Sequence, residues 1–194
     1  STANNNSAYG LTAMDAITTG DNNSAFGYGA LGAATTGADN TAVGRDALFT
    51  LTTADDNTAL GYQALYSNTS GASGVAVGHN ALFNNTTGAQ NIGIGFSAAQ
   101  SNTTGTRNIA IGYQAYDDSD TENDNLAIGY AAMTTNTAGG TLNVAVGNYA
   151  LDALTSGDDN TAVGHNALGA NNSGGRNTAV GRNSLLANTS GNYN

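Results

Sequence analysis

The densest cluster of ionisable side chains runs from Asp117 to Asp124, in the segment Asp-Asp-Ser-Asp-Thr-Glu-Asn-Asp. Its alternating carboxylates, Asp118, Asp120, Glu122 and Asp124, are hard oxygen donors of the kind that Ca²⁺ prefers, so the run is a calcium candidate. The full EF-hand pattern is missing, because no glycine stands at the required turn and no bidentate Glu follows at the right distance. The preferred interpretation is a solvated acidic turn that keeps the molecule soluble.

A second set of residues recurs at regular spacing and combines rings with guanidinium groups. Aromatic and arginine side chains are common at recognition surfaces, including those that bind sugars. The set is therefore a candidate recognition ladder for a surface receptor or glycan, although the preferred interpretation is that its rings pack between successive turns of the chain. Its members are Tyr28, Arg45, Tyr62, His79, Phe96, Tyr113, Tyr130, His165 and Arg182.

No catalytic constellation is recognisable, and we expect a protein that is not an enzyme. The chain has no Cys, and no Ser–His–acid set has a distinct setting. Paired carboxylates for glycan processing are present at Asp55-Asp56 and Asp158-Asp159, which leaves a glycan-cleaving fibre as the least favoured alternative. Glycosylation sequons also occur, as expected by chance in a chain rich in Asn and Thr. They include Asn68, Asn85, Asn102 and Asn188.

These residues sit in a repeat that spans the whole chain. Its phrase is Asn, a small or β-branched residue, Ala, a large apolar residue and Gly, and the step is 17 residues, with one step of 18. A strict period this short predicts one solenoid domain of stacked coils over residues 1–194. The eleven anchor glycines are Gly10, Gly27, Gly44, Gly61, Gly78, Gly95, Gly112, Gly129, Gly147, Gly164 and Gly181.

Positions are numbered below from the anchor glycine of each repeat. Position −4 is Asn in ten of the eleven repeats, which suits a corner residue whose side chain bonds to nearby backbone or to its neighbours along the column. Positions −3 to −1 form a short strand, and a looser second strand is expected from +4 to a Thr/Ser pair at +8 and +9. The extra residue of the long repeat is expected between Gly139 and Asn143, as a bulge.

The predicted fold class is therefore all-β, a parallel β-roll or β-solenoid of eleven 17-residue coils. Coils stacked at about 4.8 Å give a rod roughly 50 Å long. The strand looks apolar on both sides, because −1 is always large and apolar while −2 is Ala or Gly. Such strands are typically covered on both faces, so we expect self-association along this strand. The alternative is that Ala faces a cramped interior and Val or Ile is tolerated outside.

Composition limits the classes of molecule that are expected as partners. The net charge is −10, with no Lys and four Arg, so neither nucleic acid nor an anionic membrane surface is expected as a partner. No apolar run is long enough for membrane insertion of this segment. The lack of an initiator Met leads us to expect a processed chain or a segment of a longer fibre protein.

Several phrases resemble the head repeats of trimeric autotransporter adhesins, notably the segments that end at Gly44, Gly112 and Gly147. The segment 57–65, Asn-Thr-Ala-Leu-Gly-Tyr-Gln-Ala-Leu, is also similar to repeats in phage tail-fibre proteins. The resemblance implies a left-handed parallel β-roll, a homotrimer, an extracellular location on a cell surface or virion, and a role in attachment. The 17-residue period is longer than the usual adhesin head repeat, and no heptad stalk, neck or anchor is visible.

The leading functional hypothesis is accordingly a structural or adhesive fibre segment that mediates attachment to a cell surface or receptor. The alternative is an ice-binding β-solenoid, which would require a flat, exposed array of hydroxyl groups. A Thr column at +8 supplies such an array, although Asp120 and Asn172 interrupt it. The column consists of Thr18, Thr35, Thr52, Thr69, Thr86, Thr103, Thr137, Thr155 and Thr189.

Overall fold

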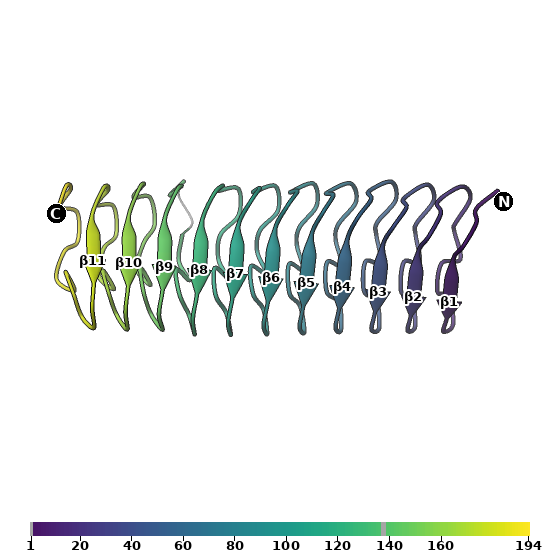
Figure 1. The fold of residues 1–194 in the computed structure, drawn as a ribbon, viewed down its shortest axis with the longest axis horizontal. Helices are drawn as coiled ribbons and strands as arrows, with labels where there is room; N and C mark the ends of the chain where they lie inside the picture. Colours follow the sequence, from purple (N-terminus) through teal and green to yellow (C-terminus); the bar gives the residue numbers. More distant parts are fainter. Residues whose placement is uncertain (1, 137–138) are drawn as a thin grey trace.

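The computed structural model describes residues 2–136 and 139–194, and it shows a straight rod of stacked coils with the two termini at opposite ends (Figure 1). Each coil contributes one three-residue strand, and the strands lie side by side along the rod. The strands are β1 (Ser7–Tyr9), β2 (Ser24–Phe26), β3 (Thr41–Val43), β4 (Thr58–Leu60), β5 (Val75–Val77), β6 (Ile92–Ile94), β7 (Ile109–Ile111), β8 (Leu126–Ile128), β9 (Val144–Val146), β10 (Thr161–Val163) and β11 (Thr178–Val180).

The strands form one parallel sheet in the order of the sequence, from β1 to β11. Every pairing joins equivalent repeat positions, so that Ile109 of β7 pairs with Leu126 of β8 and Ala110 pairs with Ala127. The backbone outside the strands also bonds from coil to coil, as when Leu31 N donates to Ala47 O at 3.0 Å. The predicted parallel β-solenoid with a 17-residue period is confirmed.

Each strand is followed by the anchor position, which only glycine can occupy. The anchor at Gly95 has φ +137, in the region that L side chains rarely adopt. A Cβ added there would lie 2.2 Å from the carbonyl oxygen of Gly112, the anchor of the next coil. The invariance of the anchor therefore has both a conformational and a steric cause.

The predicted second strand is wrong. Among the described residues, the segment after each anchor consists of turns, and strand pairing is confined to positions −3 to −1. Positions +2 and +4 adopt positive φ in every coil, with values near +50 for Gln63 and Leu65. Two left-handed residues separated by one other residue fold the segment back on itself, which an extended strand cannot do. This folding turns Ala64 and Leu65 into the interior, where both are fully buried.

The core is a narrow column of small and aliphatic side chains. The Ala at −2 points inward and is buried from β2 to β11, with Gly93 in its place in β6. It meets the Ala at +3 and the Leu at +4; a Cβ on Gly93 would lie 2.9 Å from Leu82 Cγ. Positions −3 and −1 point outward, so in the single chain only one face of each strand is buried. The interior is thus the cramped one that the alternative interpretation describes.

Two columns of buried asparagines fix the corners. In the −4 column the side-chain oxygen of each Asn accepts the backbone N–H of the next, as from Asn177 N to Asn160 Oδ1 at 3.1 Å. The amide nitrogen of Asn160 donates to Gly174 O at 2.8 Å. A second, interrupted column at +7, not predicted from the sequence, has Asn in six coils; Asn171, for example, donates to the same carbonyl and accepts from Gly174 N.

The extra residue of the long repeat lies earlier than predicted. Asn136 Nδ2 donates to Gly140 O, four residues on, whereas the equivalent bond from Asn171 reaches Gly174, three residues on. From Gly140 to Asn143 the spacing is the regular one. The insertion therefore falls between Asn136 and Gly140, a stretch that includes residues 137–138 outside the described part of the chain.

Candidate functional site

The outer surface of the sheet carries no charge and is aliphatic in its middle. Positions −3 and −1 of β1–β11 face outward and are half-buried or exposed, and none of them carries a charge at neutral pH. All 14 acidic residues and all four Arg of the chain lie outside the strands. We call this surface the strand face. Its ends carry Ser or Thr at −3, and its middle is aliphatic at both positions: Val75, Val77, Ile92, Ile94, Ile109, Ile111, Leu126, Ile128, Val144 and Val146.

The candidate recognition residues at +1 form a stacked ladder beside this face. The rings of His79 and Phe96 lie nearly parallel with centroids 5.1 Å apart, and Tyr113 and Tyr130 continue the stack at 5.2 Å. Each inner ring has a neighbour on both faces, so the ladder presents ring edges and phenol groups to solvent. The preferred interpretation, packing between coils, agrees with this geometry. Sugar binding by ring faces would require the faces that the stack already covers.

The two ends of the ladder differ from its middle. Arg45 stands between two rings, with its guanidinium carbon 5.6 Å from the centroid of Tyr28 and 5.8 Å from that of Tyr62. Towards the other end, one coil has no ring at +1. There Tyr149, at +2, packs edge-on between Tyr130 and His165. Arg182 lies at +1, one coil beyond His165. The ladder is thus nearly continuous from Tyr28 to His165.

The four calcium candidates do not converge. Both carboxylate oxygens of Glu122 point into the coil and accept backbone N–H groups, Oε2 from Asp120 and Thr121 and Oε1 from Gly139 at 3.1 Å. Asp124 accepts two hydrogen bonds from Arg107, at 2.6 and 2.8 Å, which lower the pKa of its carboxyl.

The other two calcium candidates are also separate from that pair. Asp120 accepts from the Thr103 hydroxyl, and Asp118 lies exposed. Within residues 2–136 and 139–194, no group of three or more His, Cys, Asp or Glu side chains is placed to hold a metal ion. The solvated acidic turn describes Asp118 and Asp120, which are exposed, but not Glu122, which is buried in the coil.

The same turn holds one carboxyl group in an unfavourable setting. Burial, and after it the adjacent Asp118 carboxylate, raises the pKa of Asp117 to about 6, while the hydrogen bond from Gln114 opposes the rise. Close by, Tyr116 fills the +4 position with a fully buried ring whose hydroxyl accepts from Asn125 Nδ2 at 2.8 Å. Burial raises the pKa of the Tyr116 phenol far above its usual range, so the group stays neutral.

The Thr column at +8 uses its hydroxyl protons within the rod. Thr35 Oγ1 donates to Thr52 O at 3.0 Å, and Thr86 Oγ1 donates to Thr103 O at the same distance. A surface that binds ice needs hydroxyl groups free to match the lattice, and these two retain only their acceptor lone pairs. Thr137, which belongs to the predicted column, lies outside the described residues.

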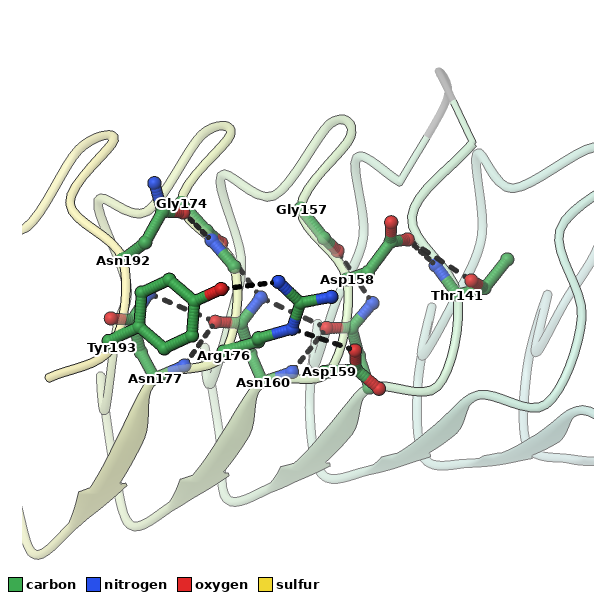
Figure 2. A network of polar contacts seen from close by, with 12 residues as sticks. Thr141, Gly157, Asp158, Asp159, Asn160, Gly174, Arg176, Asn177, Asn192 and Tyr193 are labelled. Carbon is green, nitrogen blue, oxygen red and sulfur yellow. Dashed lines mark hydrogen bonds and ion pairs between the residues drawn. The ribbon is translucent and has the colours of Figure 1, made fainter.

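The paired carboxylates do not face each other as catalytic pairs. In each pair the first aspartate caps backbone of the preceding coil: Asp55 Oδ1 accepts from Ala38 N, and Asp158 Oδ1 accepts from Thr141 N and from its hydroxyl. In the pair Asp158-Asp159, Oδ2 of the second aspartate lies 3.6 Å from Arg176 Nε. Figure 2 shows this network, with Arg176 directed between Asp159 and Tyr193. A groove of about 300 Å³ borders it.

Of the four predicted sequons, three fall on buried structural asparagines, and the fourth, Asn188, is half-buried. Asn68, Asn85 and Asn102 belong to the +7 column, are buried, and use their side-chain nitrogens for hydrogen bonds, for example from Asn68 Nδ2 to Gly71 O. A glycan attaches at this nitrogen, so the native coil cannot carry one there. The recurrent phrase Asn-Thr-Ser/Thr-Gly, which produced the sequons, was the signal that could have revealed the second buried column.

Comparison with known proteins gives no significant match to a family model, a curated protein or a solved structure. In the part of the chain that the structure describes, no helix has the length and hydrophobicity to cross a bilayer.

Proposed function

We propose that this chain is a segment of a non-enzymatic structural or adhesive fibre, which self-associates through the strand face and displays attachment sites on a cell or virion surface. The observation that carries the proposal is the strand face itself. It is an outward surface that is aliphatic in its middle and without a single charge, on a molecule whose net charge is −10.

The distribution of charge supports burial of this face in an assembly. Charged residues are depleted at the cores of protein interfaces, and contiguous exposed apolar patches on soluble proteins mark interaction sites. Like charges on two copies repel each other, so a strongly acidic chain associates most readily through a surface that keeps its carboxylates away from the contact. In this rod the carboxylates lie on the corners and turns.

The regular pitch supports an extended contact between copies. Successive coils repeat the same outward pair of side chains at about 4.8 Å, so a second copy with the same pitch can match it over the whole rod. The resemblance to trimeric fibre repeats suggests three chains around one axis, with the three strand faces directed inward. In that arrangement the +1 ladder would flank the interface, and the corners with their carboxylates would face solvent.

Light scattering of the purified chain over a range of concentrations tests the proposal. We expect a homotrimer at micromolar concentration. The matched variant replaces the aliphatic −3 residues Val75, Ile92, Ile109, Leu126 and Val144 by Thr. Thr41, Thr58, Thr161 and Thr178 already occupy this position, so each coil tolerates the change.

The five replacements should weaken association at least about 100-fold, since each removes apolar area worth about 0.8 kcal/mol per methylene. Thr36→Ser, Thr53→Ser and Thr87→Ser on the opposite corner form the control variant, which should associate like the parent. A parent chain that stays monomeric at about 100 μM would contradict the proposal.

A further inference from the structure

The groove beside Arg176 lies on the corner that leads into β10 and β11, outside the strand face (Figure 2). It opens because position −6 of the last coil is Gly175, whereas the same position carries a side chain at Ala89, Thr106 and Thr141. A Cβ added to Gly175 would lie 3.0 Å from Asp158 O and 3.6 Å from Asn192 Oδ1. A Cβ there would fit only tightly against Asp158 O, so the notch is the space beyond it, towards Asn192, into which the hydroxyls of Thr106 and Thr141 reach in their own coils.

Polar groups around the notch keep bonding capacity that the fold does not use. Asn192 Oδ1 accepts from Gly175 N at 2.6 Å, which leaves both protons of its amide nitrogen for a ligand. Asp158 binds Thr141 through Oδ1 alone, and among the described residues no donor to its Oδ2 is present. Arg176 Nη1 donates to Tyr193 OH at 2.6 Å, and the second terminal nitrogen of the guanidinium points away from that bond.

The charge of the groove selects the class of ligand. The groove is lined by two carboxylates, Asp158 and Asp159, and by one guanidinium group. Its net charge is therefore negative, and it repels an anionic ligand. No metal-binding group of side chains is present among the described residues, so a divalent cation is not the expected occupant. Donors and acceptors instead alternate, and the hydroxyls of Ser156 and Ser173 add groups that serve as both.

We propose that this groove binds a neutral sugar unit of a glycan. Adjacent hydroxyl groups of a sugar donate and accept at once, which matches the Asp158 carboxylate, the Asn192 amide and the Arg176 guanidinium around one notch. A volume of about 300 Å³ is at the lower end for ligand pockets and suits one sugar unit. The inference rests on the attachment role proposed above and names its ligand class.

The test is an NMR titration of the ¹⁵N-labelled full chain with glucose, galactose, mannose, N-acetylglucosamine and, as an anionic probe, N-acetylneuraminic acid. We expect at least one neutral sugar to shift the Gly175 amide and the Asn192 side-chain amide, with a dissociation constant of about 1 mM. No shift at these groups with any neutral sugar up to about ten times that concentration would overturn the proposal. Tighter binding of N-acetylneuraminic acid than of every neutral sugar would also overturn it.

Gly175→Thr is the decisive variant. Thr106 and Thr141 occupy the same position and donate their hydroxyl to the next coil, so the substitution should fill the notch and bond to Asn192 without unfolding the coil. It should weaken sugar binding at least tenfold. Ala89→Thr, at the same position distant from the groove, should leave binding unchanged; equal weakening by both variants would contradict the assignment.

Light scattering of the same samples separates the two proposals. Absence of sugar binding by the parent chain in an intact trimer would overturn the groove and leave self-association standing. Sugar binding by a monomer would overturn self-association and leave the groove standing.

Discussion

The carboxyl group of Asp117 is partly buried at the acidic turn, and this burial is the main cause of its raised pKa of about 6. The ordinary value of the group is 3.8, so between these two values the folded chain holds more protons than the unfolded chain. The free energy of unfolding therefore falls as pH rises through this window, and the loss is complete above about pH 6.

Asp117→Asn should consequently raise the melting temperature at pH 7 and reduce its decline between pH 4 and 7. Thermal melts at a series of pH values measure this. Asp39→Asn, at a corner carboxylate for which no such burial operates, should leave the slope of the parent. If both variants change the slope equally, a general charge effect and not the burial of Asp117 is responsible.

The buried asparagines are the second point at the residue scale. Asn160 accepts from Asn177 N and donates to Gly174 O and Asn143 Oδ1, all inside the rod. Asn160→Ala leaves buried backbone groups without partners and should cost about 1–3 kcal/mol in the free energy of unfolding.

Chemical denaturation measures this cost. Asn172→Thr makes the exposed +8 position like its neighbours and should change stability by less than about 0.5 kcal/mol. A cost for Asn160→Ala as small as that of the control would show that water satisfies the freed groups.

At the scale of the element, the strand–glycine corner is the part that tolerates least change. Gly95→Ala places a Cβ 2.2 Å from Gly112 O at φ +137, so it should destabilise the chain by about 3 kcal/mol or more. Gly139→Ala also has positive φ, at +104, but its Cβ would meet nothing within 4 Å.

Comparison of these two alanine variants by thermal denaturation isolates the clash from the backbone strain. The Gly139 variant should lose clearly less stability than the Gly95 variant. Equal losses would mean that the left-handed conformation alone makes glycine necessary at the anchor.

The strand and its anchor could be predicted from the sequence because both impose a residue type at every repeat. The turn after the anchor could not, because Leu48 and Gln63 disfavour positive φ and give no local signal for it. Their conformation is fixed by hydrogen bonds to the neighbouring coils, as from Gln63 N to Arg45 O. The groove could not be predicted either. It depends on the missing side chain of Gly175, and the sequence alone does not show which residues stack against that position.

At the scale of the whole molecule, contacts between strands join only consecutive coils. Deletion of residues 92–108, one full period, joins Asn91 to Ile109 and preserves every repeat position. The shortened chain should fold with the same circular-dichroism spectrum and a modestly lower melting temperature, as expected for stacked repeats.

Deletion of residues 92–100 removes about half a coil and should abolish cooperative unfolding, since it places apolar positions against corners. A shortened chain that fails to fold in both cases would show that coupling extends beyond neighbouring coils. Deletion of residues 92–108 also shortens the strand face by one coil, so the shortened chain should self-associate more weakly than the parent.

The axial direction of the hydrogen bonds has a mechanical consequence. A pulling force between the two ends acts along these bonds and loads the coils in series, so the rod yields by peeling one coil at a time instead of shearing as a block. Each released coil converts about 5 Å of rod into roughly 55 Å of extended chain. A rod built this way lengthens in steps under sudden load and limits the tension transmitted along it.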